Sequence, residues 1–346
     1  MKYPKSLSKL GTVGFVAPSY GCNIEPYKSR LDNAVSRIKE WGHPVMLGPN
    51  CYLGEGVGIS NTPKLCGKEL TDLYCSRDND VLLSCGGGEL MNETMDYVDW
   101  ERIAAAPPKW FEGYSDNTNF TYLLTTMLDT ASIYGSNRPV FGTDPLHESL
   151  IDSYRLLRGE LSEVSNYEAY EGIGDSLATP ENPLAPINAV RPFNPVFFGT
   201  DGKQSESFQA EGRLLGGCLD VLANLRGTKY DHTTAFCEKY REDGILWFLE
   251  NCELGPMQVR RTLWAMKQSG WFQNAAGFLI GRPLGAAEQY GLTQERAFVE
   301  TLSELRVPIA YGLDFGHLPP MMPMVCGAYG KAEGSGKTFR MRYEFR

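Results

Sequence analysis

Long apolar runs are missing from this chain of 346 residues. No stretch approaches the ~20 consecutive apolar residues of a membrane-spanning helix, so we expect no membrane segment. The N-terminal segment has lysines near its start, but its apolar stretch is short and broken by glycine and proline, unlike a signal peptide. These features predict a cytoplasmic protein.

Clusters of positive charge are also missing. The formal net charge is -9, and the chain has no run of lysine and arginine. Nucleic-acid binding depends on clustered cations that displace counterions from phosphates, so a nucleic-acid partner is not expected. The charge pattern favours a small substrate.

Metal-binding and nucleotide-binding motifs are absent as well. The four histidines lie far apart, and the sequence has no HExxH, no CxxC pair, no Walker A lysine and no complete GxGxxG. We therefore expect no metal site. The nine cysteines are odd in number and scattered, which is typical of a reducing compartment and not of a disulfide framework.

Alternating strand and helix patterns fill the first part of the chain. Such alternation predicts a largely parallel sheet with helices on both faces. The predicted strands are 12–19, 44–48, 81–84 and 109–114, and the predicted helices are 25–41, 68–75 and one beginning near residue 116.

The composition and periodicity of the sequence change between about 160 and 205, where the sequence is proline-containing and weakly periodic. We predict an N-terminal domain at 1–160, a linker or lid at 161–205 and a C-terminal α/β domain at 206–346. In the last of these, the predicted helices are 213–225, 256–269 and about 294–305, and the predicted strands are 245–250 and 276–281.

Ser115 lies where an apolar strand gives way to a helix, in KWFEGYSDNTNF. In serine hydrolases such a turn exposes the nucleophile, and the next backbone N–H, here that of Asp116, can stabilise an oxyanion. The match to G-x-S-x-G is incomplete because Asn117 replaces the second glycine. Ser-Asp-Asn-Thr is also a good N-cap sequence, so spacing alone allows either role.

Three glycines follow the strand at 81–84. Without side chains, Gly86, Gly87 and Gly88 let the backbone approach a ligand closely and offer N–H donors to it. With Asp116, the turn at Gly87 and Gly88 is a candidate oxyanion hole. A tight turn and a phosphate loop are the other interpretations.

A carboxylate and a histidine complete the candidate site. Glu250 ends the apolar run ILWFLE, at the edge of a sheet where α/β proteins usually display functional groups, although Glu253 could serve as well. His317 lies in a loop with Gly316 and two prolines, and a solvated loop histidine is the alternative. His317 would accept the proton of Ser115, and Glu250 would orient the imidazole.

Four sets of segments occur in a characteristic order: TVGFVAPS, then CGGGE with DYVDW, then GYSDNTNF, then ILWFLENCELGP with GWFQNAAGFLIGRP and FGHLPPMMPMVCGA. In these segments the chain resembles the LD-carboxypeptidase family of serine peptidases, most closely its microcin C self-immunity branch. The resemblance spans nearly the whole chain.

This resemblance implies a flavodoxin-like N-terminal domain with a parallel sheet and a smaller C-terminal α/β domain of the swivelling, barrel-like kind. It places a triad of Ser115, Glu250 and His317 between them and implies homodimers without metal or cofactor. The implied activity is hydrolysis of a peptide or amide bond. The chain length favours aminoacyl-nucleotide or peptide-nucleotide conjugates such as microcin C as substrates.

Departures from the family pattern bear on the substrate. Muropeptide carboxypeptidases typically have an arginine before the glycine pair, where this chain has Cys85. The immunity branch often stacks an aromatic residue of the linker region on adenine, and the candidates here are Phe193, Phe197 and Phe198. Arg191 and Arg213 are candidates to hold a substrate carboxylate.

Three other functions stay open at this point. One is an LD-carboxypeptidase that removes the terminal D-residue from muropeptide tetrapeptides. A second is a thiol enzyme with Cys85 as nucleophile and His317 as base, as in glutamine amidotransfer. A third is a non-catalytic ligand-binding protein in which the three glycines hold an anion.

Overall fold

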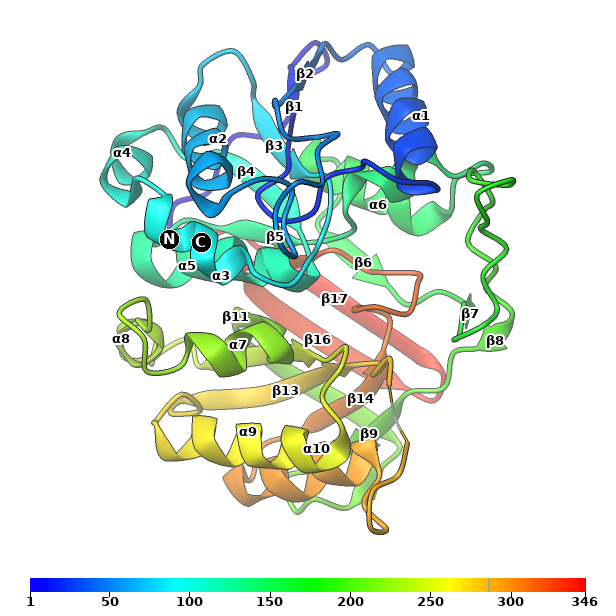
Figure 1. The fold of residues 1–346 in the computed structure, drawn as a ribbon. Coiled ribbons are helices and arrows are strands. Elements are labelled where there is room, and N and C mark those ends of the chain that lie inside the picture. The colour runs from blue at the N-terminus through cyan, green and yellow to red at the C-terminus, as the bar shows by residue number, and fades with distance from the viewer. Residues whose placement is uncertain (286) are drawn as a thin grey trace.

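The computed structural model describes residues 1–285 and 287–346 and shows two α/β units, one above the other in Figure 1. The upper unit is built on a six-stranded sheet of order β15-β5-β4-β3-β1-β2. Its strands are β1 (Val13–Val16), β2 (Val45–Leu47), β3 (Val81–Ser84), β4 (Trp110–Gly113), β5 (Ser132–Tyr134) and β15 (Met324–Cys326). Strands β1 to β5 pair in parallel, as predicted, and β15 is antiparallel to β5.

The helices of this unit are α1 (Tyr27–Glu40), α2 (Pro63–Cys75), α3 (Met91–Thr94), α4 (Trp100–Ala105), α5 (Thr118–Leu128) and α6 (Glu148–Leu157). Every residue of β1, β3 and β4 is buried, which explains why these strands are mostly apolar. Helix α1 shows the expected amphipathic pattern, with Leu31, Ala34, Val35 and Ile38 facing the core. The carboxyl ends of these strands carry the loops of the candidate site.

The lower unit has a nine-stranded sheet of order β10-β9-β14-β13-β12-β11-β16-β17-β6. Its strands are β6 (Glu163–Ser165), β9 (Val196–Phe198), β10 (Gln204–Ser205), β11 (Ser207–Cys218), β12 (Ile245–Glu250), β13 (Ala275–Gly281), β14 (Ile309–Leu313), β16 (Tyr329–Ser335) and β17 (Thr338–Glu344). Strands β11 to β14 are parallel to one another. The helices are α7 (Leu219–Leu225), α8 (Thr233–Lys239), α9 (Pro256–Gln268) and α10 (Gln294–Leu302).

The predicted helix at 213–225 is wrong in its first half. Residues 213–218 continue β11, and only 219–225 are helical. Strand β11 is held on one side by β12 and on the other by β16. A Cβ atom at Gly216 would lie 1.7 Å from the carbonyl oxygen of Phe248, so the two strands approach each other closely because Gly216 has no side chain.

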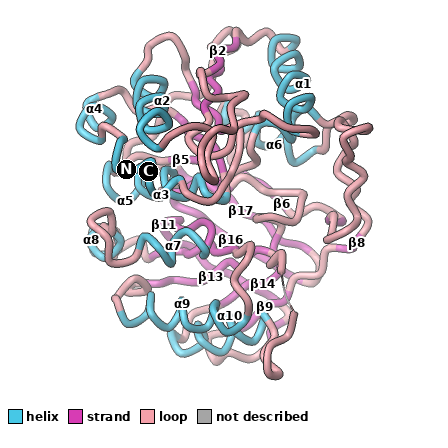
Figure 2. Tube along the Cα trace, viewed as in Figure 1, coloured by secondary structure: helices cyan, strands magenta, loops and turns pink. Residues whose placement is uncertain are grey.

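Segment 161–205 is mostly loop in Figure 2, on the side of the molecule that carries β8. It also supplies β6, β9 and β10 to the lower sheet, and β7 (Ala169–Tyr170) pairs with β8 (Arg191–Pro192). In turn, β15 belongs to the C-terminal part of the chain but completes the upper sheet. The domain boundaries at 160 and 205 and the lid role stay predictions. None of the described helices is long and apolar enough to cross a membrane.

Candidate active site

Ser115 opens the turn between β4 and α5. Its φ of 62° lies in the left-handed region, which serine rarely adopts, as expected for a strained strand-to-helix elbow. The turn continues as a short 3-10 helix, Ser115–Asn117, and neither it nor α5 has a side-chain N-cap. The helix-cap interpretation of Ser115 is therefore wrong, since its hydroxyl bonds elsewhere.

Three side chains form a continuous chain of hydrogen bonds. The Oγ of Ser115 lies 2.8 Å from Nε2 of His317, and Nδ1 of His317 lies 2.8 Å from Oε2 of Glu250. Ser115 comes from the upper unit, whereas Glu250 ends β12 and His317 follows β14 in the lower unit. With Nδ1–H donated to the carboxylate, Nε2 is the atom that accepts the serine proton.

The electrostatics of the Glu250–His317 pair suit a general base. Burial opposes ionisation of Glu250, but His317 and the hydroxyl of Tyr134 outweigh it and hold the pKa of this carboxyl below its usual value. Burial likewise disfavours charge on His317, but the Glu250 carboxylate holds the pKa of His317 well above its usual value. The site thus favours the imidazolium that forms when His317 takes a proton.

The loop that carries His317 is positioned by close packing. Gly316 has a φ of 109°, and a Cβ atom there would lie 2.8 Å from Oε2 of Glu250. Only glycine combines this conformation with so close an approach. Arg282 pairs with Asp314 and donates to the carbonyl oxygen of Leu318 at 3.2 Å, which fixes the loop on both sides of His317.

The glycine loop borders the nucleophile. A Cβ atom at Gly87 would lie 3.0 Å from Cβ and 3.2 Å from Oγ of Ser115. The N–H of Gly87 has no acceptor among the described residues, so it can bind a substrate oxygen. Gly88 packs instead against Ser19 and Gly58, where a Cβ atom would lie 2.1 Å from Oγ of Ser19.

The side chain of Asp116 holds the turn after Ser115 in place through hydrogen bonds. This buried carboxylate accepts hydrogen bonds from Oγ of Ser19 at 2.6 Å and from the N–H of Met91 at 2.9 Å. Asn117, which replaces the glycine of the usual elbow motif, donates to the carbonyl oxygen of Gly86 at 2.7 Å. The departure from the motif therefore ties the elbow to the glycine loop.

Tyr134 is a site residue that the sequence reasoning missed. Its hydroxyl donates to Oε1 of Glu250 and accepts the N–H of Ser115 at 3.1 Å, so it links the nucleophile to the carboxylate. Tyr134 is the last residue of β5. The rule that drew attention to Glu250, a polar group at the carboxyl end of a buried strand, could have found it.

We expect Tyr134→Phe to lower kcat by about tenfold or more. A hydrogen bond to a charged group is worth about 1.5–3 kcal/mol, and its loss frees Glu250 to move relative to His317. Steady-state kinetics and thermal melting measure the effect. The control is Tyr122→Phe, because Tyr122 is equally buried but bonds Thr233 outside the site. Equal losses of kcat in both variants would contradict a positioning role for Tyr134.

The phenylalanines predicted to stack on a substrate do not reach the site. Phe193, Phe197 and Phe198 are 2, 3 and 8% exposed, so their ring faces are covered by the core. Phe197 packs against Phe208, with 6.2 Å between ring centroids. In this structure the three rings pack in the core, and none of them lines a cavity beside the triad.

The two arginines predicted to hold a substrate carboxylate form ion pairs away from the triad. Arg191 is exposed on β8 and forms an ion pair with Asp175 at 2.5 Å. Arg213 is 4% exposed and is held by Asp243 and by the carbonyl oxygen of Gly327. Neither lines a cavity beside the triad, so neither is placed to hold a substrate carboxylate.

Cys85 is a poor nucleophile in this setting. The residue is 1% exposed, and burial, with Cys22 and Cys51 beside it, raises the pKa of the Cys85 thiol well above its usual value. Reactive cysteines need a lowered pKa and access to substrate. The thiol alternative is therefore disfavoured, since Nε2 of His317 bonds Ser115.

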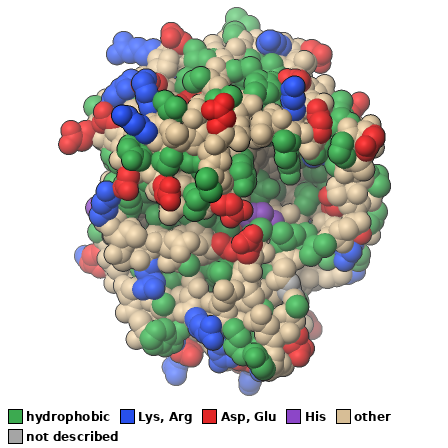
Figure 3. Space-filling view, in the orientation of Figure 1, with side chains coloured by type: hydrophobic (Ala, Val, Ile, Leu, Met, Phe, Trp, Pro, Cys, Tyr) green, Lys and Arg blue, Asp and Glu red, His purple; other side chains and the backbone are tan. Residues whose placement is uncertain are grey.

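Three cavities surround the triad. A cavity of about 350 Å³ is lined by Ser115 and Asp116 together with three acidic side chains, Glu89, Asp220 and Glu253. One of about 90 Å³ borders His317, and one of about 550 Å³ borders Gly86 and Gly87. Figure 3 shows a hollow between the two units, with a histidine and acidic side chains beside it.

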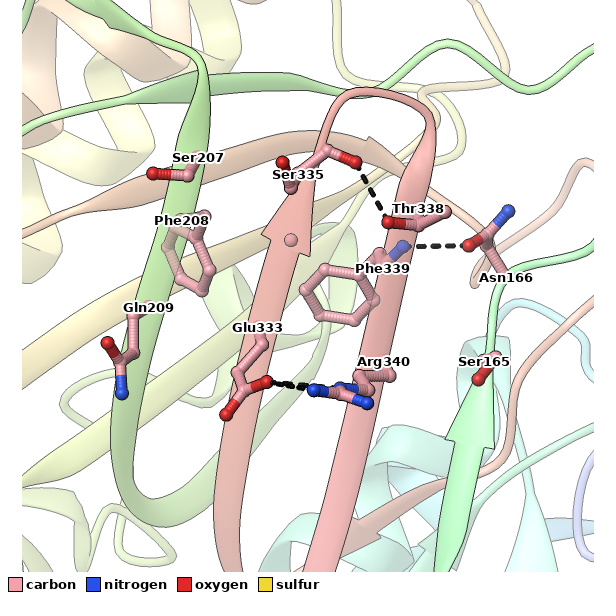
Figure 4. Close-up of a pocket in the computed structure, with 11 residues that line it drawn as sticks. Ser165, Asn166, Ser207, Phe208, Gln209, Glu333, Ser335, Thr338, Phe339 and Arg340 are labelled. Atoms are coloured by element: carbon pink, nitrogen blue, oxygen red, sulfur yellow. Dashed lines mark hydrogen bonds and ion pairs between the residues drawn. The ribbon is translucent and has the colours of Figure 1, made fainter.

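Another cavity, of about 840 Å³, lies over β6, β11, β16 and β17 and is shown in Figure 4. Glu333 and Arg340 pair across its floor, and the N–H of Phe339 donates to Asn166 at 2.7 Å. None of its lining residues borders the triad. Across residues 1–285 and 287–346, no three histidine, cysteine, aspartate or glutamate side chains are grouped to hold a metal ion.

Curated relatives cover most of the chain. A probable murein peptide carboxypeptidase of Bacillus subtilis is 26% identical over 97% of this chain and 92% of its own length. The microcin C7 self-immunity protein MccF of Escherichia coli is 24% identical over 91% of this chain and 88% of its own.

Solved structures share the fold. MccF in complex with glutamyl sulfamoyl guanosine matches with a TM-score of 0.79 and 20% identity, covering 99% of this chain and 98% of its own. An MccF-like protein of Streptococcus pneumoniae in complex with AMP matches with a TM-score of 0.76 and 22% identity, covering 97% of this chain and 99% of its own.

Family models match both units. Residues 13–135 match the LD-carboxypeptidase N-terminal domain, and residues 211–331 match the LD-carboxypeptidase C-terminal domain. The two matches follow each other in the order expected from the sequence segments described above. This protein belongs to the LD-carboxypeptidase family.

Proposed function

We propose that this protein is a serine hydrolase of amide bonds with Ser115 as nucleophile, His317 as general base and Glu250 as the residue that orients the histidine. The supporting observation is the unbroken hydrogen-bond chain between them, with 2.8 Å at each of its two steps. This arrangement of nucleophile, base and orienting group is shared by enzymes of acyl transfer. A non-catalytic binding protein would have no need of it.

In the first half of the reaction, Nε2 of His317 takes the proton of Ser115 as Oγ attacks the substrate carbonyl. The oxyanion is bound by the N–H groups of Asp116 and of the Gly87–Gly88 turn, each contributing on the order of 3 kcal/mol. The imidazolium then gives its proton to the leaving nitrogen, and the C–N bond breaks to leave an acyl-enzyme. In the second half, His317 activates water, which releases the acid and restores Ser115.

For the substrate we propose an amide in an aminoacyl-nucleotide or peptide-nucleotide conjugate such as microcin C. The cavity of about 550 Å³ beside the glycine loop supports this, because it lies within the ~300–1,000 Å³ typical of sites for ligands of that size. The second candidate is removal of the terminal D-residue from muropeptide tetrapeptides. Its support is a basic side chain, Arg30, in the wall of the same cavity.

We also propose that the protein acts in the cytoplasm as a homodimer without metal or cofactor. All nine cysteines are free in the structure, which supports a reducing compartment. The dimer rests on the family resemblance, and multi-angle light scattering tests it directly.

The test is a substrate panel followed by mass spectrometry. Wild type and Ser115→Ala are incubated with an aminoacyl sulfamoyl adenosine and with a muropeptide tetrapeptide. Release of the amino acid from the nucleoside by wild type alone supports the leading proposal. Loss of only the terminal D-residue from the tetrapeptide selects the second candidate, and equal product from both proteins contradicts the serine mechanism.

A further inference from the structure

Arg30 of α1 lines both the cavity beside His317 and the larger cavity beside the glycine loop. It is the one lysine or arginine among the described residues that line these two cavities. Tyr114, the residue before the nucleophile, also lines both. The two cavities therefore form one region beside the triad, and the titratable charged side chains that line it are Arg30, His317 and Glu171.

The guanidinium of Arg30 is fixed but not neutralised. Its Nε donates to the carbonyl oxygen of Pro183 at 2.7 Å, and its Nη2 donates to that of Ala185 at 3.1 Å. In the described part of the chain, Nη1 has no acceptor and Arg30 forms no ion pair, and the nearest opposing charge is the carboxylate of Glu171 in the wall of the smaller cavity. Two bonds to neutral carbonyl groups set the orientation of the side chain and leave its charge available to a ligand.

Arg30 lies on the side of the triad that faces the leaving group of the substrate. His317 must give its proton to the leaving nitrogen, so the leaving group lies on the side of the triad where His317 and Arg30 line the same cavity. The cavity lined by Ser115 carries Glu89, Asp220 and Glu253 and no cation among its described residues. An anionic group would be repelled there and attracted toward Arg30.

The walls around Arg30 are apolar and accessible. Tyr20, Ile24 and Tyr27 line the larger cavity and are 43, 60 and 50% exposed. Exposed apolar side chains gathered at a concave site are typical of ligand binding. With about 550 Å³, this space holds a group much larger than a single small residue.

We propose that Arg30 is a specificity-determining residue that binds the negative charge of the substrate's leaving group. The inference rests on the proposed function and narrows it to amides whose leaving group carries an anion. A carboxylate of a terminal residue and a phosphoryl or sulfamoyl group of a nucleotide share this chemistry. Arg30 sets the preference for an anionic leaving group, while the triad carries out the chemistry.

The experiment compares two pairs of substrates, each with an anionic and a neutral leaving group, and measures how the preference within each pair changes when Arg30 is replaced. One pair is an aminoacyl sulfamoyl adenosine and the neutral aminoacyl amide of 5′-amino-5′-deoxyadenosine. The other is a peptide ending in D-alanine and its C-terminal carboxamide. Wild type, Arg30→Met and Arg30→Lys are measured with Arg261→Met as control, because Arg261 is exposed on α9.

We expect wild type and Arg261→Met to prefer the anionic member by about 10- to 100-fold in kcat/KM, which is the usual worth of a charge-assisted hydrogen bond. Arg30→Met should lower kcat/KM on the anionic member far more than on the neutral member, and Arg30→Lys should keep part of the preference. The pair with the larger Arg30-dependent preference identifies the source of the anion. Equal loss on both members of each pair, or an unchanged preference in Arg30→Met, overturns the proposal.

A binding measurement separates this inference from the proposed function. Calorimetry with AMP and with D-alanine is done on Ser115→Ala and on Ser115→Ala with Arg30→Met. If wild type cleaves neither anionic substrate, the proposed function fails, yet Arg30-dependent binding of either compound still supports the anion site. Binding of neither compound, or binding that ignores Arg30, overturns the site even where Ser115 proves to be the nucleophile.

Discussion

Ser115→Ala is expected to lower kcat by about 10⁴- to 10⁶-fold, the range found when a serine triad loses its nucleophile. The variant keeps His317 and Glu250 in place but has no atom to form the acyl-enzyme. Any remaining rate comes from the oxyanion donors and substrate binding. Alanine keeps the same backbone preferences as serine at a φ of 62°, so stability should change little.

The matched control is Ser136→Ala. Ser136 lines the cavity beside His317 but makes no hydrogen bond to it, so its loss should leave kcat within a few-fold of wild type. Substrate binding to Ser115→Ala by calorimetry and its thermal melting show whether the site and fold survive. A Ser115→Ala protein that turns over at a tenth of the wild-type rate would remove Ser115 from the role of nucleophile.

The parallel core of the fold was predictable from sequence. Strands β1, β3 and β12 are buried along their whole length and apolar except for the last residue of β3 and of β12, and such runs bounded by loops stand out in the chain. The helix predicted at 213–218 is wrong because apolar runs are ambiguous. A run such as RLLGGC fits a helix or a buried strand equally, and only pairing with β12 and β16 decides between them.

The residues of the candidate site were predictable to different degrees. Ser115 has a local signal in the sequence, the strand-to-helix turn, and the structure contains this turn. Glu250 and Glu253 could not be separated by sequence, because which carboxylate meets His317 depends on how β12 and the loop after β14 pack. In the structure Glu253 is exposed and Glu250 is fully buried.

The structure does not bring the predicted substrate-contact residues to the cavities beside the triad, because residue type alone does not reveal exposure. Phe197 and Arg213 have chemistry suited to a ligand, yet the first fills the core and the second pairs with Asp243. Arg30 gave no signal, since an arginine on an amphipathic helix is usually solvated. Its position in the wall of the cavity comes from the packing of α1 against residues far away in the chain, including Pro183 and Ala185.

Glu250→Gln is expected to lower kcat by about 10³- to 10⁴-fold, nearly as much as loss of the nucleophile. The amide has no charge with which to stabilise the imidazolium of His317. It can also present its NH₂ group to Nδ1, which would leave the proton on Nε2, the atom that must accept from Ser115. The control is Glu253→Gln, which removes a carboxylate from the cavity of Ser115 without touching His317, and a few-fold effect is expected.

The pH dependence of stability is a second test of the interaction between Glu250 and His317. The pKa of Glu250 is lowered in the folded protein, so its contribution to stability is present above the ordinary value of 4.5 and is lost as the pH falls through the folded value. The pKa of His317 is raised, so its contribution is present below the ordinary value of 6.5 and is lost as the pH rises through the folded value. Denaturant unfolding should therefore show that Glu250→Gln loses the most free energy of unfolding, relative to wild type, at pH values between the ordinary pKa values of glutamate and histidine.

The pH profile of kcat/KM separates orientation from a purely structural effect. In wild type the rate should rise with pH as His317 loses its proton, at a pKa held up by Glu250. In Glu250→Gln the carboxylate is gone and burial remains, so the pKa of His317 falls and the rise in rate moves to lower pH. A variant that is slow but keeps the wild-type profile would show that Glu250 does not govern the charge of His317. A profile shifted to lower pH, with Glu253→Gln unchanged, would assign that role to Glu250.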